Sequence, residues 1–120
     1  MKIKLASINL ETADPQKSKR FYLDLLGMEE NKERSHGDAF VYLAGGGCDI
    51  TIATPEEGIA AEPSRTMELG FEVDDIEEAR ARFARAGYND VESKSMGWGE
   101  VLETRDADGH RVIVYQFTRG

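Results

Sequence analysis

Trp98 is the first candidate for a ligand contact, because it is the only tryptophan of the chain and stands between Gly97 and Gly99. An indole ring on a glycine-flanked loop can stack on a planar ring or on a cation. The alternative is that the ring covers an edge of a sheet, and the sequence leaves both interpretations open.

Two acidic residues, Asp49 and Glu68, occupy strand positions that we expect to face a binding cleft. A carboxylate there can pair with a ligand cation, or act as a general base where it is partly desolvated. Glu68 is therefore the candidate catalytic residue if the protein is an enzyme. The alternative for Glu68 is an exposed acid at the rim of a pocket.

The other reactive residue types have no partners at catalytic spacing. Cys48 is the only cysteine, which excludes a disulfide within the chain and a cysteine-based zinc site, and no histidine or asparagine is placed to activate it. His36 and His110 are interpreted as solvent-exposed loop histidines. Glycines 45–47 are not followed by Lys-Ser/Thr and a helix, so they do not form a phosphate loop.

Capping signals predict two helices that would position these side chains. Asp14 before a proline predicts a helix over residues 15–26, with a glycine directly after it. A second helix is predicted to begin at Asp74 or Asp75 and to end at Gly87.

Alternating apolar residues predict the strands between and around the helices. The predicted strands are residues 2–10, 39–43, 49–53, 67–73, 100–104 and 111–117, with two polar strands, 28–34 and 90–95, added from their position in the order. Residues 55–65 have no periodicity and are predicted to be a linker.

The order of elements is the same in both halves of the chain. The predicted helix caps Asp14 and Asp75 are 61 positions apart, and the terminating glycines Gly27 and Gly87 are 60 apart. This indicates an internal duplication of a βαβββ unit of about 60 residues. We therefore expect an α+β fold with two tandem modules, about 1–60 and about 65–120, whose mixed sheets curl around a cleft.

Strand alternation separates the side chains under the helices from those that face the cleft. The cleft set is rich in short polar groups, acids and aromatic rings, which suits a preformed pocket for a polar organic ligand with a cationic part. The predicted ligand-binding residues are Ser7, Asn9, Tyr42, Asp49, Thr51, Glu68, Trp98, Arg111 and Tyr115.

The charge of the chain limits its partners. The 15 Lys and Arg residues against 23 Asp and Glu residues give a net charge of −8, which disfavours nucleic acid and an anionic membrane surface and favours a cationic or neutral ligand. No apolar run is long enough for a signal peptide or a membrane span. We expect a soluble cytoplasmic protein.

The arrangement resembles the vicinal oxygen chelate superfamily, which includes glyoxalase I, extradiol dioxygenases, fosfomycin-modifying enzymes and bleomycin-resistance proteins. Three segments carry the resemblance along nearly the whole chain: Asp14 through Phe21-Tyr22 to Gly27-Met28, Val73-Asp74-Asp75-Ile76-Glu77-Glu78-Ala79, and Trp98-Gly99 followed by Arg105-Asp106-Ala107-Asp108-Gly109-His110. Ala107 stands where the family's turn usually has proline. The resemblance implies one glyoxalase/bleomycin-resistance-like domain over residues 1–120.

The metal-dependent members of that family hold a divalent ion with histidine and glutamate side chains. By distance from the shared landmarks, the four ligand positions fall at Ser7, Thr51, Glu68 and Ile113. Only Glu68 is a good ligand, and a divalent site needs several converging donors. We therefore expect no tightly bound divalent metal and no cofactor.

Three functions remain open. The first is a small-molecule binding protein, nearest to the metal-free bleomycin-resistance-like group, that sequesters a polar or cationic compound and so confers antibiotic resistance. The second is a lyase, isomerase or dioxygenase-like enzyme that uses Glu68 as base, or an atypical metal site such as Asp49 with Glu68. The third is an interaction domain with a vestigial cleft. We expect a homodimer, because the face without helices carries apolar and aromatic side chains that need cover: Ile3, Leu5, Tyr115 and Phe117.

Overall fold

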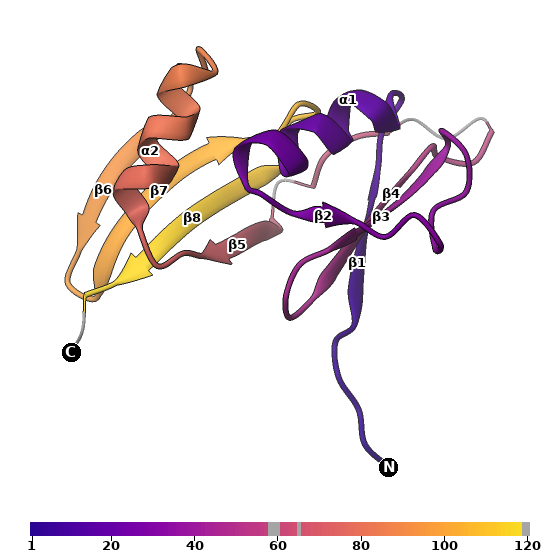
Figure 1. The fold of residues 1–120 in the computed structure, drawn as a ribbon, viewed down its shortest axis with the longest axis horizontal. Helices are drawn as coiled ribbons and strands as arrows, with labels where there is room; N and C mark the ends of the chain where they lie inside the picture. The colour runs from indigo at the N-terminus through magenta and orange to yellow at the C-terminus, as the bar shows by residue number, and fades with distance from the viewer. Residues whose placement is uncertain (58–60, 65, 119–120) are drawn as a thin grey trace. The chain divides into compact units, whose positions relative to one another are not determined.

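The structure is a computed structural model that describes residues 1–57, 61–64 and 66–118 (Figure 1). The chain divides into two compact units, Met1–Glu62 and Pro63–Gly120. Each unit contains one mixed four-stranded sheet and one helical segment, so the predicted α+β class with two βαβββ modules is confirmed. Part of the predicted linker, 58–60 and 65, lies outside the described residues. No helix of the described residues is long and apolar enough to cross a membrane.

The first sheet has the strand order β1-β4-β3-β2. Its strands are β1 Ser7–Glu11, β2 Glu29–Glu30, β3 Phe40–Ala44 and β4 Asp49–Ala53. β1 runs parallel to β4, with Ser7 beside Asp49 and Asn9 beside Thr51, and the other neighbours are antiparallel.

The second sheet repeats this topology in the order β5-β8-β7-β6. Its strands are β5 Glu68–Glu72, β6 Glu92–Met96, β7 Gly99–Arg105 and β8 Arg111–Phe117. β5 runs parallel to β8, with Glu68 beside Arg111. The same strand order in both sheets agrees with the repeated order of helix caps and terminating glycines in the two halves of the sequence.

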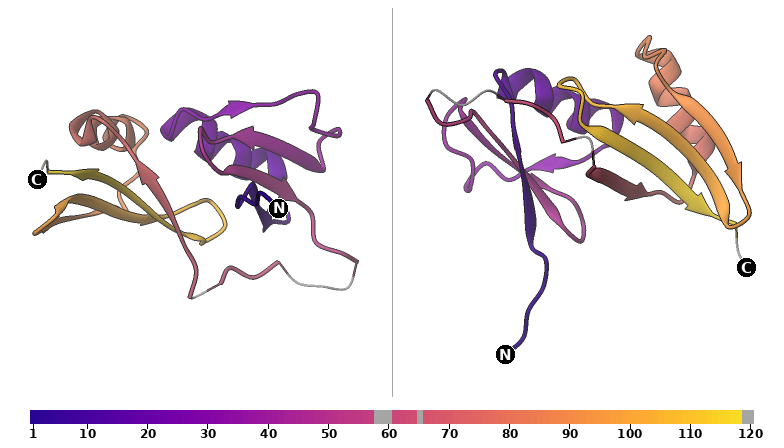
Figure 2. Two further views of the ribbon diagram at one scale, coloured as in Figure 1. Left: turned by 90° about the horizontal axis from the view of Figure 1, so that it is seen from below. Right: turned by 180° about the vertical axis from the view of Figure 1, so that it is seen from behind.

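Each sheet is covered by a helix on one face (Figures 1 and 2). In the first unit, α1 Pro15–Arg20 contacts β3 and β4, and in the second, α2 Ile76–Arg85 contacts β7 and β8. The cores lie between helix and sheet. The core side chains are Leu10, Phe21, Tyr22, Val41, Leu43, Ile50 and Ile52 in the first unit, and Leu69, Ile76, Phe83, Leu102, Val112 and Val114 in the second.

The caps form as the sequence predicts. The Asp14 carboxylate accepts a hydrogen bond from the Lys17 N–H, and Asp75 accepts two from Glu77 and Glu78, which satisfies N–H groups that have no partner inside the helix. Gly27 and Gly87 both have a φ of +71°, a left-handed conformation that glycine adopts without strain.

The predicted helix over 15–26 forms, but its second half, Phe21–Leu25, is a π-helix, η1, whose side chains Phe21, Tyr22 and Leu25 are buried. Most strand bounds differ from the prediction by one or two residues, and two differ by more. The predicted strand 2–10 begins only at Ser7, because its neighbour β4 begins at the partner residue Asp49. The predicted strand 28–34 shrinks to Glu29–Glu30, because the Asn31 side chain accepts a hydrogen bond from the Arg34 N–H and turns the chain.

Candidate functional site

The uncovered face of the first sheet carries a hydrogen-bonded polar cluster. The Tyr42 hydroxyl donates to Asp49 Oδ2 at 2.8 Å, and the Gly45 N–H donates to Asp49 Oδ1 at 3.1 Å. The hydrogen bond from Gly45 has the largest effect, followed by that from Tyr42, and together they hold the pKa of the Asp49 carboxyl below its usual value. Asp49 is therefore an ionised group that is already engaged by its own strand pair.

Three further predicted site residues lie in this cluster or beside it. Thr51 donates from its hydroxyl to Asn9 Oδ1 at 2.7 Å, across the parallel pair of β4 and β1. Ser7 lies beside Asp49 in the same register and is exposed. The guanidinium of Arg34, which the sequence interpretation did not include, donates to the Tyr42 hydroxyl at 3.3 Å and covers its ring at 5.3 Å.

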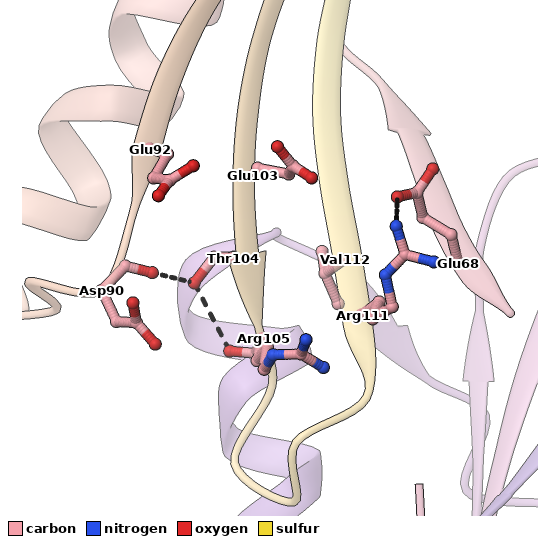
Figure 3. Close-up of a pocket in the computed structure, with 8 residues that line it drawn as sticks. All are labelled: Glu68, Asp90, Glu92, Glu103, Thr104, Arg105, Arg111 and Val112. Atoms are coloured by element: carbon pink, nitrogen blue, oxygen red, sulfur yellow. Dashed lines mark hydrogen bonds and ion pairs between the residues drawn. The ribbon is translucent and has the colours of Figure 1, made fainter. Parts of the chain in front are cut away.

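The uncovered face of the second sheet has a charged hollow of about 170 Å³ (Figure 3). Its lining consists of Glu68, Asp90, Glu92, Glu103, Thr104, Arg105, Arg111 and Val112. Four of these residues are acidic and two are arginines. Only Glu68 and Arg111 of this lining belong to the predicted set.

Glu68 is not the isolated carboxylate that the sequence interpretation assumed. Arg111 Nη2 donates to Glu68 Oε2 at 2.8 Å, and both side chains are 33% exposed. The pairing follows from the register of β5 and β8, which places the two residues side by side. A ligand cation that binds Glu68 must therefore share the carboxylate with Arg111 or displace the guanidinium.

Two carboxylates face each other directly in the same hollow. Glu92 on β6 pairs with Glu103 on β7 in the antiparallel register, an arrangement in which like charges repel. Lys94, two residues along β6, forms an ion pair with Glu103. The pKa of Lys94 is raised above its usual value. The main cause is its hydrogen bond to Glu103 and the charge of that carboxylate, and the charges of Glu92 and Glu68 add to it. The electrostatic field at this face thus favours a positive charge.

An aromatic cluster lies farther along the same strand, β8. The Trp98 ring centre is 5.8 Å from that of Tyr115 and 5.5 Å from that of Phe117, in tilted or edge-on geometry. Trp98 nevertheless stays 43% exposed and Phe117 54% exposed. Trp98 therefore covers part of the sheet and still presents ring surface to solvent, and its role as a ligand contact stays a prediction.

The aromatic cluster and the charged hollow belong to one surface. Side chains alternate between the faces of a strand, so Arg111 and Tyr115, four residues apart on β8, lie on the same face. At about 3.3 Å per residue, they are roughly 13 Å apart. The acidic residues Glu92 and Glu103 gave no signal in the sequence, because only the register of β6 and β7 makes them neighbours.

At three of the four positions implied for a divalent metal, the side chain has another partner or no ligand atom. Thr51 hydrogen-bonds to Asn9, Glu68 pairs with Arg111, and Ile113 offers no ligand atom. Asp49 and Glu68, the atypical metal pair considered above, lie in different units. Within the described residues of either unit, these positions do not gather a set of metal ligands.

Comparison with known proteins identifies relatives of the whole chain. A sequence model described as "Glyoxalase/Bleomycin resistance protein/Dioxygenase superfamily" matches residues 4–114. No curated protein matches the chain significantly.

Solved structures share the fold at low sequence identity. A lactoylglutathione lyase from Agrobacterium tumefaciens has a TM-score of 0.74 and 19% identity over 94% of this chain and 92% of its own. A glyoxylase/bleomycin resistance protein/dioxygenase domain from Frankia sp. EAN1pec has a TM-score of 0.73 and 23% identity over 100% and 94%. A putative glyoxalase family protein from Bacillus anthracis has a TM-score of 0.73 and 17% identity over 98% and 96%.

Proposed function

The chain belongs to the Glyoxalase/Bleomycin resistance protein/Dioxygenase superfamily, and from that premise we propose that it binds and sequesters a polar organic compound with a cationic group and a planar ring. In this proposal the binding needs no metal. A cytoplasmic location is part of the same proposal, as is a role in resistance to a toxic compound.

The observation that carries the proposal is the arrangement on the uncovered face of the second sheet. Glu92 and Glu103 face each other there, Lys94 pairs with Glu103, and a bound cation would offset the remaining charge of Glu92. The exposed ring of Trp98 lies on the same face, farther along the strands, and can stack on a planar group. A compound that spans roughly 13 Å would reach both ends.

Glu68 has a defined role in this proposal. It already binds one cationic group, the Arg111 guanidinium, which shows which chemistry the carboxylate accepts. A ligand cation would add to this pair or replace the arginine. The remaining proposed contacts, Ser7, Asn9, Tyr42, Asp49 and Thr51, belong to the first unit, and their role is the recognition of polar groups.

The test is a titration followed by the fluorescence of Trp98, the only tryptophan. Two compound sets are compared: basic glycopeptides of the bleomycin type with planar cationic dyes, and anionic analogues of matched size. Cationic compounds should quench or shift the emission. If only anionic compounds do so, the proposal is wrong.

Three variants then locate the site by calorimetry with the best cationic compound. Trp98→Ala should weaken binding about 2- to 30-fold, the range expected for a cation or ring stacked on indole. Glu68→Gln should weaken it at least about 10-fold, the loss of one charge-assisted hydrogen bond. Asp24→Asn is the control, because Asp24 is an exposed acid on the helical segment of the first unit and is not in the lining of the hollow. Unchanged affinity in Glu68→Gln would favour the alternative, an enzyme of the same superfamily.

A homodimer is the second part of the proposal. The large apolar side chains Ile3, Leu5 and Phe117 are 85%, 72% and 54% exposed, and apolar groups of this size favour a partner surface. Light scattering at micromolar concentration should give twice the chain mass of 13.4 kDa. A mass of one chain would contradict this part.

A further inference from the structure

The hairpin turn between β7 and β8 gathers three metal-ligating side chains within five residues. Asp106, Asp108 and His110 each offer one ligand atom, and these atoms all lie within 4.8 Å of one another. None of the three occupies a position that the family resemblance implies for a metal.

The turn is held in place by its own hydrogen bonds. Asp106 is only 4% exposed, and its Oδ1 accepts hydrogen bonds from the N–H groups of Asp108 and His110, both at 2.9 Å. The Asp106 N–H donates to the His110 carbonyl at 2.9 Å and closes the hairpin. The backbone of the turn and the Asp106 carboxylate are therefore already ordered, which lowers the entropy lost when an ion binds.

His110 differs from the exposed loop histidine that the sequence interpretation assumed. Its side chain is half-buried, and its Nε2 atom is buried without a hydrogen-bond partner among the described residues. A buried polar atom in this state costs free energy, because it has lost water and gained nothing in return. A metal ion bound at Nε2 would remove that cost.

We propose that this turn binds one divalent transition-metal ion, for which Zn²⁺ is the natural probe. Carboxylate oxygens and imidazole nitrogens are both ligand atoms that zinc binds, and water can supply the fourth ligand of a three-residue site. Ligand atoms around tetrahedral zinc are roughly 3.4 Å apart, so side-chain movements on the order of 1 Å complete the site. Mg²⁺ and Ca²⁺ prefer oxygen ligands only, so they bind weakly here.

The experiment measures Zn²⁺ binding to the full, untagged chain by calorimetry, with elemental analysis of the dialysed protein. We expect one equivalent of zinc with a dissociation constant of about 10 μM or lower, unaffected by millimolar Mg²⁺ or Ca²⁺. His110→Gln and Asp108→Asn should each weaken binding at least about 10-fold, in the range that altered ligand shells show. Asp106 is left intact, because its carboxylate also holds the backbone of the turn.

His36→Gln is the matched control, because His36 is the only other histidine and is exposed. Its zinc affinity should equal that of the wild type. Circular dichroism of each variant checks the fold, and the two ligand variants test the site independently of each other. Absence of bound zinc, an unchanged affinity in either ligand variant, or an equal loss in His36→Gln would overturn the proposal. None of these results bears on the cation-binding face, which the fluorescence titration tests separately.

Discussion

Removal of the Glu92 carboxylate from the facing pair should make the protein more stable while it weakens cation binding. Glu92 and Glu103 lie directly opposite each other in the register of β6 and β7. Glu92→Gln keeps the shape of the side chain and removes its charge. The effect on the free energy of unfolding and the effect on affinity therefore have opposite signs.

The expected gain in stability is small and can be estimated. Two unit charges about 6 Å apart in water repel each other by roughly 0.7 kcal/mol, and measured cross-strand pairs contribute about 0.2–1 kcal/mol. Glu92 is also attracted to Lys94, so part of the gain is lost in the variant. We expect a net stabilisation of about 0.2–0.6 kcal/mol, which raises the melting temperature by about 1–3 °C for a chain of this size.

Urea unfolding at 20 mM and at 500 mM NaCl measures this effect. At the higher salt the Debye length is about 4 Å, so the difference between variant and wild type should nearly vanish. Glu72→Gln is the control, because it changes the net charge of −8 by the same amount on an exposed strand position that does not face another acid. The reasoning is refuted if Glu92→Gln destabilises the protein, or if both variants gain equally at low salt.

Four further outcomes are expected. Trp98→Ala should lower the free energy of unfolding by about 1–3 kcal/mol in urea, because the indole loses two aromatic partners, each contributing about 0.5–1.5 kcal/mol; a change below 0.3 kcal/mol would show that the ring does not stabilise the sheet. The hydrogen bond with Lys94 is the main cause that lowers the pKa of Glu103 in the folded protein. The ionised Glu103 carboxylate therefore adds stability above the ordinary glutamate pKa of 4.5, and this stability is lost as the pH falls through the lower pKa of the folded state. Glu103→Gln should therefore be less stable than the wild type at pH 7, since Lys94 loses its partner, and should match it at strongly acidic pH, as unfolding curves across pH can check. Asp75→Ala should cost about 0.5–2 kcal/mol in thermal unfolding, since two helix N–H groups lose their cap, whereas Asp75→Asn should cost much less. Gly99→Ala should destabilise the β7–β8 pair, because a Cβ there would meet the Gln116 carbonyl, and hydrogen exchange of β8 amides should speed up.

Local signals in the sequence were sufficient for the elements and their order. Asp14 and Asp75 cap helices because their carboxylates reach N–H groups two or three residues away, and this requires no knowledge of the rest of the chain. The strands 49–53 and 111–117 form with the predicted bounds, since the alternating direction of side chains depends on the strand alone. The duplication followed from repetition of these local signals.

The candidate site depended on strand register, which local signals do not contain. Glu68 meets Arg111 from 43 positions away only because β5 and β8 align in parallel, and Glu92 meets Glu103 through a different pairing. A shift of either pair by one residue would turn those side chains to the opposite face. The sequence therefore determined which residues form strands and helices. The tertiary structure decided which charges are neighbours and that the Nε2 atom of His110 is buried. Both of these properties depend on contacts between segments of the chain and not on contacts within one segment.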